Sequence, residues 1–153
     1  MGLDIYGRAN HQKLSMLDDD ATEYYFWGGK WSDREAGAPD YSHEAEEVAH
    51  AGMSYGGYFF FRQVLASTYL GITITNTGEP WPNPADTEDP LWKLINYADN
   101  EGVFGPPMVK RVAKRLAELD RDLLPEDWRD ALDRWREVFV DTAEYEDGCV
   151  QWD

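Results

Sequence analysis

The chain has 153 residues, which is the size of one ordinary domain. It carries 30 acidic and 14 basic residues, and the formal net charge of -16 disfavours direct binding to the phosphate backbone of nucleic acids. Because 42% of the residues are hydrophobic and 7 Trp, 9 Tyr and 6 Phe are present, the chain is not a disordered acidic tail. We therefore expect a single acidic folded domain over residues 1–153.

Three features predict a cytoplasmic protein that does not enter a membrane. Cys149 is the only cysteine, so no intramolecular disulfide can form and an oxidising compartment is not required. The first residues, Met1–Tyr6, lack the basic region and the apolar run of a signal peptide. The longest apolar clusters, such as Tyr58–Phe61, are far shorter than the ~18 residues that indicate a membrane span.

The first half of the chain predicts short strands around one long helix. Branched and aromatic residues in Leu3–Tyr6 and Glu23–Trp27 favour two strands. The polar stretch Ser42–His50 favours a helix, with Ser42 as its N-cap. A central helix is predicted over Ser54–Leu70, ended by a glycine, and Ile72–Thr75 is then expected to form a strand.

The second half predicts three more helices and a final strand. Asp89 and Pro90 form a capping pair for a short amphipathic helix, and Pro106 and Pro125 each begin a longer one. The alternating segment Cys149–Trp152 indicates a last strand. This order of elements predicts a small α+β domain of about four helices, with short N- and C-terminal strands in a mainly antiparallel sheet.

One candidate metal site lies in the predicted polar helix. His43, Glu47 and His50 are four and three residues apart, so on a helix they would share one face and could offer two imidazoles and a carboxylate. A solvated acidic helix is the alternative interpretation. Because no further ligand is identifiable, we do not predict a bound metal, and no cofactor motif is present either.

A second candidate site is a small pocket at the start of the central helix. The segment Ser54–Arg62 contains two glycines, which permit close approach of a backbone, while Ser54, Tyr55, Tyr58 and Arg62 supply polar groups. The alternative is that the glycines allow tight helix packing and Tyr55 is half-buried in the core.

A polar turn at Asp99–Gly102 could complete this pocket. The turn lacks carboxylates at the first and last positions that a calcium loop requires, so a calcium loop is not predicted. Asp99 and Glu101 remain candidates for binding a ligand hydroxyl, and exposed turn residues are the alternative.

Three blocks of sequence resemble an uncharacterised family of small bacterial and bacteriophage proteins. The blocks are Met1–Ile5, the segment Ala51–Tyr58 running on to Arg62, and Leu94–Gly105. The resemblance implies a shared fold and draws attention to residues in the second and third blocks: Ser54, Tyr55, Arg62, Asp99 and Glu101. The chain departs from the family pattern at Ala98 and Asn100, where the family has Ser and Cys, and the family implies no activity.

These observations leave several functions open. The leading hypothesis is a non-enzymatic protein-interaction module, acting on a host or bacterial protein and located in the host cytoplasm if a phage encodes it. The alternative is a small-ligand binder or hydrolase-like enzyme, with its pocket between Ser54–Arg62 and Asp99–Gly102. An acidic mimic of DNA and a self-assembling structural protein are lesser alternatives, and the sequence does not fix the oligomeric state.

Overall fold

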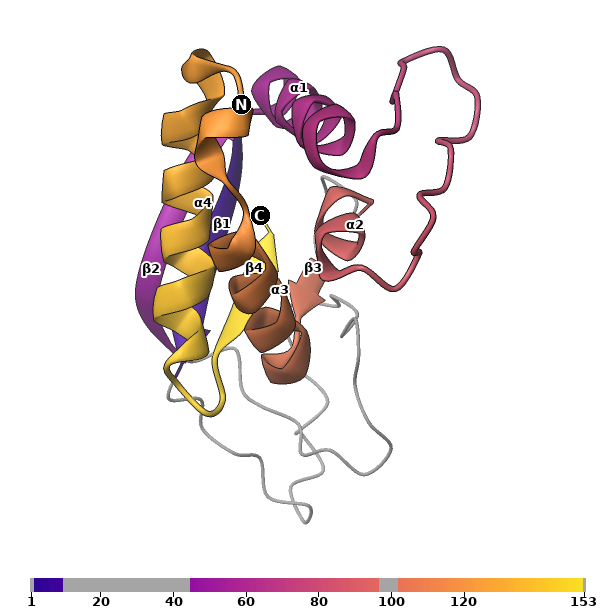
Figure 1. Cartoon of the computed structure of the whole chain (residues 1–153). Helices are drawn as coiled ribbons and strands as arrows, with labels where there is room; N and C mark the ends of the chain where they lie inside the picture. The colour runs from indigo at the N-terminus through magenta and orange to yellow at the C-terminus, as the bar shows by residue number, and fades with distance from the viewer. Residues whose placement is uncertain (1, 10–44, 97–101, 153) are drawn as a thin grey trace.

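The computed structural model describes residues 2–9, 45–96 and 102–152, which form an α+β fold. Within these ranges a four-stranded antiparallel sheet packs against four α-helices (Figure 1). The strands are β1 (Gly2–Ala9), β2 (Glu46–Ser54), β3 (Gly102–Phe104) and β4 (Cys149–Trp152). The helices are α1 (Tyr55–Leu65), α2 (Pro90–Ile95), α3 (Pro106–Glu118) and α4 (Glu126–Ala143).

The two chain ends supply the centre of the sheet. The strand order is β2-β1-β4-β3, so β1 lies between β2 and β4, and β2 and β3 are the edges. Ile5 of β1 is opposite Ala51 of β2 on one side and Trp152 of β4 on the other. Figure 1 shows the longest helix, α4, lying across β1 and β2.

Strand β1 alternates between two environments. Its odd-numbered residues, Leu3 to Ala9, are buried, whereas Asp4, Tyr6 and Arg8 are only partly buried. Because successive side chains of a strand point to opposite faces, one face of the sheet meets the helices and the other carries a polar row. The predicted strand at Leu3–Tyr6 is thereby confirmed and is longer than expected.

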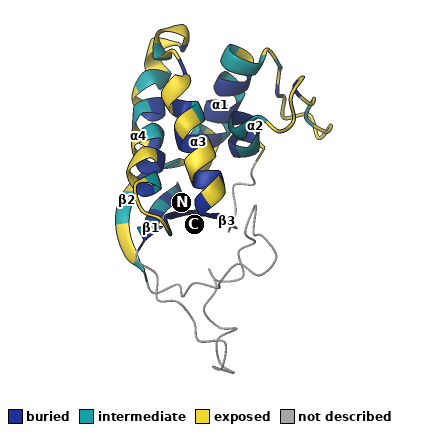
Figure 2. Cartoon of the chain, turned by 60° about the horizontal axis from the view of Figure 1, so that its bottom comes forward, coloured by how far each residue is buried: buried dark blue, intermediate teal, exposed yellow. Residues whose placement is uncertain are grey.

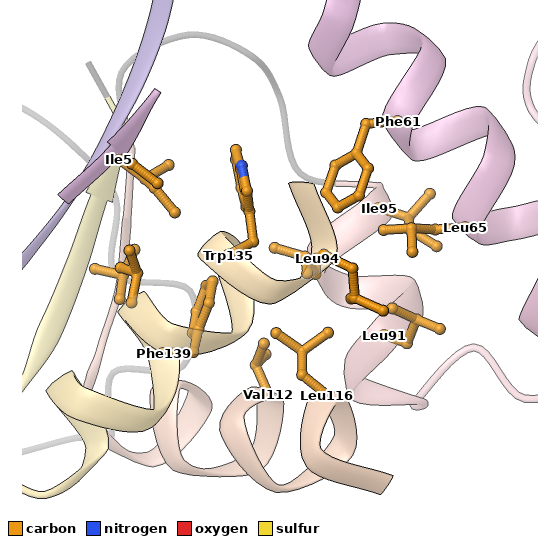
Figure 3. Close-up of a cluster of buried hydrophobic side chains, with 14 of the residues drawn as sticks. Ile5, Phe61, Leu65, Leu91, Leu94, Ile95, Val112, Leu116, Trp135 and Phe139 are labelled. Atoms are coloured by element: carbon orange, nitrogen blue, oxygen red, sulfur yellow. The ribbon is translucent and has the colours of Figure 1, made fainter. Parts of the chain in front are cut away.

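The core lies between the helix-covered face of the sheet and the inner sides of the helices. Figure 2 shows buried residues on these inner sides and exposed residues on the outer sides. Side chains from every helix meet there, with Ile5 of β1 on the sheet side (Figure 3). The helical residues labelled in that view are Phe61, Leu65, Leu91, Leu94, Ile95, Val112, Leu116, Trp135 and Phe139.

The predicted central helix and the three helices predicted in the second half of the chain are confirmed, and the local signals explain their ends. The Ser54 hydroxyl caps α1 by accepting a hydrogen bond from the Gly57 amide at 3.0 Å. A π-helical turn, Ala66–Leu70, continues this helix to Gly71, whose φ of 65° lies in the left-handed region that glycine adopts without strain. Helices α2 and α3 begin with proline, which fits this position because an N–H group there would have no partner within the helix. The final strand is also confirmed as β4.

Two local predictions are wrong. The predicted helix over Ser42–His50 is instead the start of β2 where the structure describes it, because pairing with β1 outweighs a weak local preference. The predicted strand Ile72–Thr75 has no strand structure. Its Ile74 is buried and its carbonyl accepts a hydrogen bond from the Gln63 side chain at 2.6 Å, so the segment is held by α1. The predicted strand Glu23–Trp27 lies outside the described residues.

Asp89 ties α2 to α3, and we expect its replacement to destabilise the fold. Its carboxylate caps the Leu91 amide at 2.9 Å and accepts two hydrogen bonds from Arg115, at 3.0 and 3.2 Å. Asp89→Ala removes the cap and the ion pair, so the free energy of unfolding should fall by about 1–3 kcal/mol. Urea denaturation measures the loss. Asp86→Ala, which removes only an exposed loop contact with the Glu88 amide, should cost less. An equal loss for the two variants would contradict this account.

Candidate functional site

The structure assigns two of the predicted pocket residues to the start of α1. The Ser54 hydroxyl is engaged as the N-cap, so its oxygen serves the helix rather than a ligand. Tyr55, the first residue of the helix, is 37% exposed. The glycine next to it, Gly56, has open space where a side chain would be. This part of the predicted pocket is therefore exposed surface.

Tyr58 and Arg62 lie in the core. The Arg62 guanidinium stacks between two rings, 4.5 Å from the centroid of Tyr58 and 4.6 Å from that of Trp81. Its Nη1 donates a hydrogen bond to the Ile95 carbonyl at 3.3 Å, and only 7% of the residue is exposed. The Tyr58 hydroxyl accepts a hydrogen bond from the Trp152 indole at 3.3 Å. These two side chains hold α1, α2, β4 and the loop at Trp81 together.

The second half of the predicted pocket cannot be placed beside the first. Asp99 and Glu101 lie outside the described residues. Arg62 does contact Ile95, the last residue of α2, so the described chain brings α1 to the end of the helix that precedes this turn.

The predicted metal ligands do not share a helix. Glu47 and His50 are both on β2, and His43 lies outside the described residues. An irregularity in the pairing places Glu47 opposite Arg8 and His50 opposite Tyr6, so a bulge brings both to one face of the sheet. Among the residues that the structure describes, no group of three His, Cys, Asp or Glu side chains could hold a metal ion.

His50 belongs instead to a polar row on the face of the sheet away from the helices. Its Nε2 is 2.9 Å from the Asp4 carboxylate, and its ring stacks on Tyr6 with centroids 4.8 Å apart. A Cβ atom at Gly52 would collide with the Asp4 carboxylate, so this glycine leaves the room that Asp4 needs to reach His50. Both partners are more than 40% exposed, and the pair is therefore open to solvent.

The same row continues across β1 to β4. The Arg8 guanidinium lies 5.2 Å from the centre of the Tyr6 ring, and its Nε donates a hydrogen bond to the Gln151 side chain at 2.9 Å. These contacts link three neighbouring strands through side chains as well as through the backbone. They fix the position of β1 relative to both neighbours and so hold β2 in register.

A cleft of about 200 Å³ opens between β2 and α4. We call it the β2–α4 cleft; it is lined by three consecutive strand residues and one stripe of the helix. These residues are Val48, Ala49, His50, Arg134, Glu137, Val138 and Asp141. The helical ones are spaced three, one and three residues apart, which places them on a single side of α4. Of these helical residues, Arg134, Glu137 and Asp141 are exposed and Val138 is buried.

The strand beside this cleft is an edge of the sheet. In the described chain β2 pairs only with β1, and Figure 1 shows it at the outer side of the sheet beneath α4. An edge strand presents N–H and C=O groups that have no partner within the sheet, and another extended chain can pair with them. The β2–α4 cleft thus places an outer strand of the described sheet beside charged side chains of the helix.

Sequence reasoning missed this site because it assigned the wrong element to the strand. A weak signal is present, since Ala49, Ala51 and Met53 alternate with more polar residues over the second half of β2. The bulge near Val48 interrupts that alternation, and the acidic residues before it favour a helix. The position of a strand at a sheet edge also depends on pairing with residues far away in the chain.

Comparisons with known proteins give no relative. No protein-family model matches the chain, and neither a curated protein nor a solved structure is significantly similar to it. The resemblance to the bacterial and bacteriophage family therefore stays a prediction. Separately, none of the helices in the described ranges has the length and apolar character needed to cross a membrane.

Proposed function

We propose that this chain is a protein-interaction module that binds an extended segment of a partner protein along the edge of β2. The observation that carries the proposal is the open edge of β2 beside the β2–α4 cleft. We propose further that it acts in the cytoplasm, and the resemblance to bacteriophage proteins favours a host protein as the partner.

The chemistry of strand addition requires two things, and both are found at this edge. Backbone pairing supplies the affinity, and pockets for alternate side chains supply the specificity. Strand β2 has nine residues, which is long enough to pair with a peptide over several positions. The cleft beside it, at about 200 Å³, can receive a side chain that points towards α4.

The described residues support this function better than they support a small-ligand binder or hydrolase-like enzyme. A hydrolase-like site would require accessible polar groups from Ser54–Arg62, but Ser54 caps a helix and Arg62 is stacked between rings in the core. Neither of these two residues lines the β2–α4 cleft. The charge of -16 serves the proposal as a source of solubility and of attraction for basic partners.

Peptides selected from a random heptapeptide library on the immobilised protein provide a direct test. We expect the selected peptides to shift the backbone amide signals of residues 46–51 and 134–141 in NMR spectra, and to slow hydrogen exchange in β2. Peptides that map to another surface, or a selection that yields no binder, would overturn the proposal.

A proline at Val48 tests whether the strand edge itself is used. Val48 is the residue of β2 that has no partner in the register with β1, so proline there removes an amide of the strand without replacing a paired residue. Val48→Pro should weaken binding of the selected peptides up to about tenfold, the equivalent of one hydrogen bond. Val48→Ala, which keeps the amide, is the control and should bind nearly normally. A folded Val48→Pro protein with unchanged affinity would contradict edge pairing.

A further inference from the structure

The helical side of the β2–α4 cleft carries two acidic side chains one turn apart. Glu137 and Asp141 both line the cleft and are both exposed. At a rise of about 1.5 Å per residue, their positions are separated by roughly 6 Å along the axis of α4. Arg134 lies on the same stripe, one turn before Glu137.

Neither of these two carboxylates forms an ion pair within the described part of the chain. Ion pairs are formed there by Asp4, Glu88, Asp89 and Asp133, whereas neither Glu137 nor Asp141 takes part in one. Like charges four residues apart on a helix destabilise it slightly. A cationic group bound in the cleft would relieve this repulsion.

The spacing of the carboxylates matches the side-chain repeat of an extended chain. Residues i and i+2 of a strand lie on one face and are about 6.6–6.8 Å apart, close to the separation of Glu137 and Asp141 along α4. A strand added to the edge of β2 would direct every second side chain towards α4. Two such neighbouring side chains can therefore meet the two carboxylates at once.

We propose that the partner segment is cationic, with two Lys or Arg side chains at alternate positions facing Glu137 and Asp141. This inference rests on the proposed function and adds the chemistry of the partner to it. Each exposed ion pair contributes about 0.2–1 kcal/mol, so the two together should change affinity by about 2- to 30-fold. The preference is thus for a spacing of basic residues, beyond a general attraction to positive charge.

Two synthetic peptides of equal charge separate spacing from net charge. The first, Thr-Val-Lys-Val-Lys-Val-Thr, has its lysines at alternate positions; the second, Thr-Val-Val-Lys-Lys-Val-Thr, has them adjacent. Fluorescence anisotropy at 0.15 M salt should show about 1.4- to 5-fold tighter binding of the first peptide, because the second can direct only one of its lysines towards α4. Equal binding of the two peptides, or no binding of either, would overturn the inference.

Matched variants then locate the effect on the protein. Glu137→Gln combined with Asp141→Asn should remove the preference for alternate lysines. Glu118→Gln combined with Asp122→Asn makes the same two chemical changes at exposed positions that do not line the cleft, and should leave the preference intact. Arg134→Gln should strengthen binding of the alternating peptide or leave it unchanged. If both pairs of substitutions act equally, recognition by Glu137 and Asp141 is wrong.

The outcomes also separate this inference from the proposed function. If neutral or acidic library peptides shift the amides of β2 and lose affinity with Val48→Pro, the edge is the binding site and only the cationic preference is wrong. If the lysine peptides bind without shifting any amide of β2, both are wrong.

Discussion

Trp135→Ala should lower the free energy of unfolding by about 3–5 kcal/mol, the largest effect that we expect from a single side chain. Trp135 is 1% exposed and stands at the centre of the aromatic cluster. Its ring stacks on Tyr58 at a centroid distance of 5.3 Å and also contacts Phe61 and Trp152, at 5.7 and 6.3 Å. Removing it opens a cavity between α1, α4 and the sheet. Urea denaturation followed by tryptophan fluorescence and circular dichroism measures the loss.

Phenylalanine at two positions serves as the control for this prediction. The Trp135 indole N–H is buried without a hydrogen-bond partner among the described residues, so Trp135→Phe gives up no hydrogen bond. The Trp152 indole N–H donates to the Tyr58 hydroxyl, and Trp152→Phe leaves that hydroxyl without this donor. We therefore expect Trp135→Phe to cost less than Trp152→Phe. The reverse order, or a loss below about 1 kcal/mol for Trp135→Ala, would contradict this account of the core.

Gly148→Ala should destabilise the chain by about 2–3 kcal/mol, because a Cβ atom there would collide with the backbone carbonyl of Thr142. Gly148 lies in the tight turn that joins α4 to β4, and its amide donates a hydrogen bond to the Tyr145 carbonyl at 3.2 Å. Relieving the collision would move the turn, and β4 begins at the next residue. Thermal and urea unfolding of the purified variant measure the effect.

Gly7 also packs against Thr142, and comparing it with Gly148 tests whether these collisions cause the loss of stability. At Gly7 of β1 an added Cβ would meet the Thr142 hydroxyl, a side-chain group that has no hydrogen-bond partner in the described structure. Thr142→Ala should therefore restore part of the stability lost in Gly7→Ala. It should restore little in Gly148→Ala, where the obstacle is the backbone. Equal rescue of both glycine variants would show that the collisions are not the cause.

The helices were predictable from the sequence because their signals are local. In α4 the buried residues Ala131, Trp135, Val138 and Phe139 recur at helical spacing, and proline precedes the helix. The cap at Asp89 was predicted from the residues alone and acts as a cap in the structure, whereas Ser54, which was assigned to a pocket, caps α1. Each of these features depends only on residues within a few positions.

The sheet was less predictable because its pairing is not local. The polar start of β2 favours a helix, yet pairing of Glu46 and Glu47 with the end of β1 makes it a strand. The segment Ile72–Thr75 has β-branched residues but pairs with no strand among the described residues, and it is irregular. Propensity measures what a residue tolerates, whereas the presence of a neighbouring strand decides what it adopts.

The candidate site was likewise predictable only in its local features. The polar types and glycines of Ser54–Arg62 were noticed correctly, but their side chains serve capping and core stacking. Which polar residue is accessible depends on packing against Trp81 and Ile95, which are distant in the sequence. The β2–α4 cleft joins segments about ninety residues apart, and no local pattern indicates that they meet.

The placement of β1 at the centre of the sheet has a consequence for how the protein is made. Arg8 pairs with Cys149 and Ile5 with Trp152, so β1 cannot pair with β4 until residues 149–152 have been synthesised. Contacts of such long sequence separation slow folding, because the loop between them must be closed first. During translation β1 can pair early only with β2, and β4 joins once residues 149–152 have left the ribosome. Until then the edge of β1 that β4 later covers is exposed in the nascent chain, and chaperone binding should be most favourable at this stage.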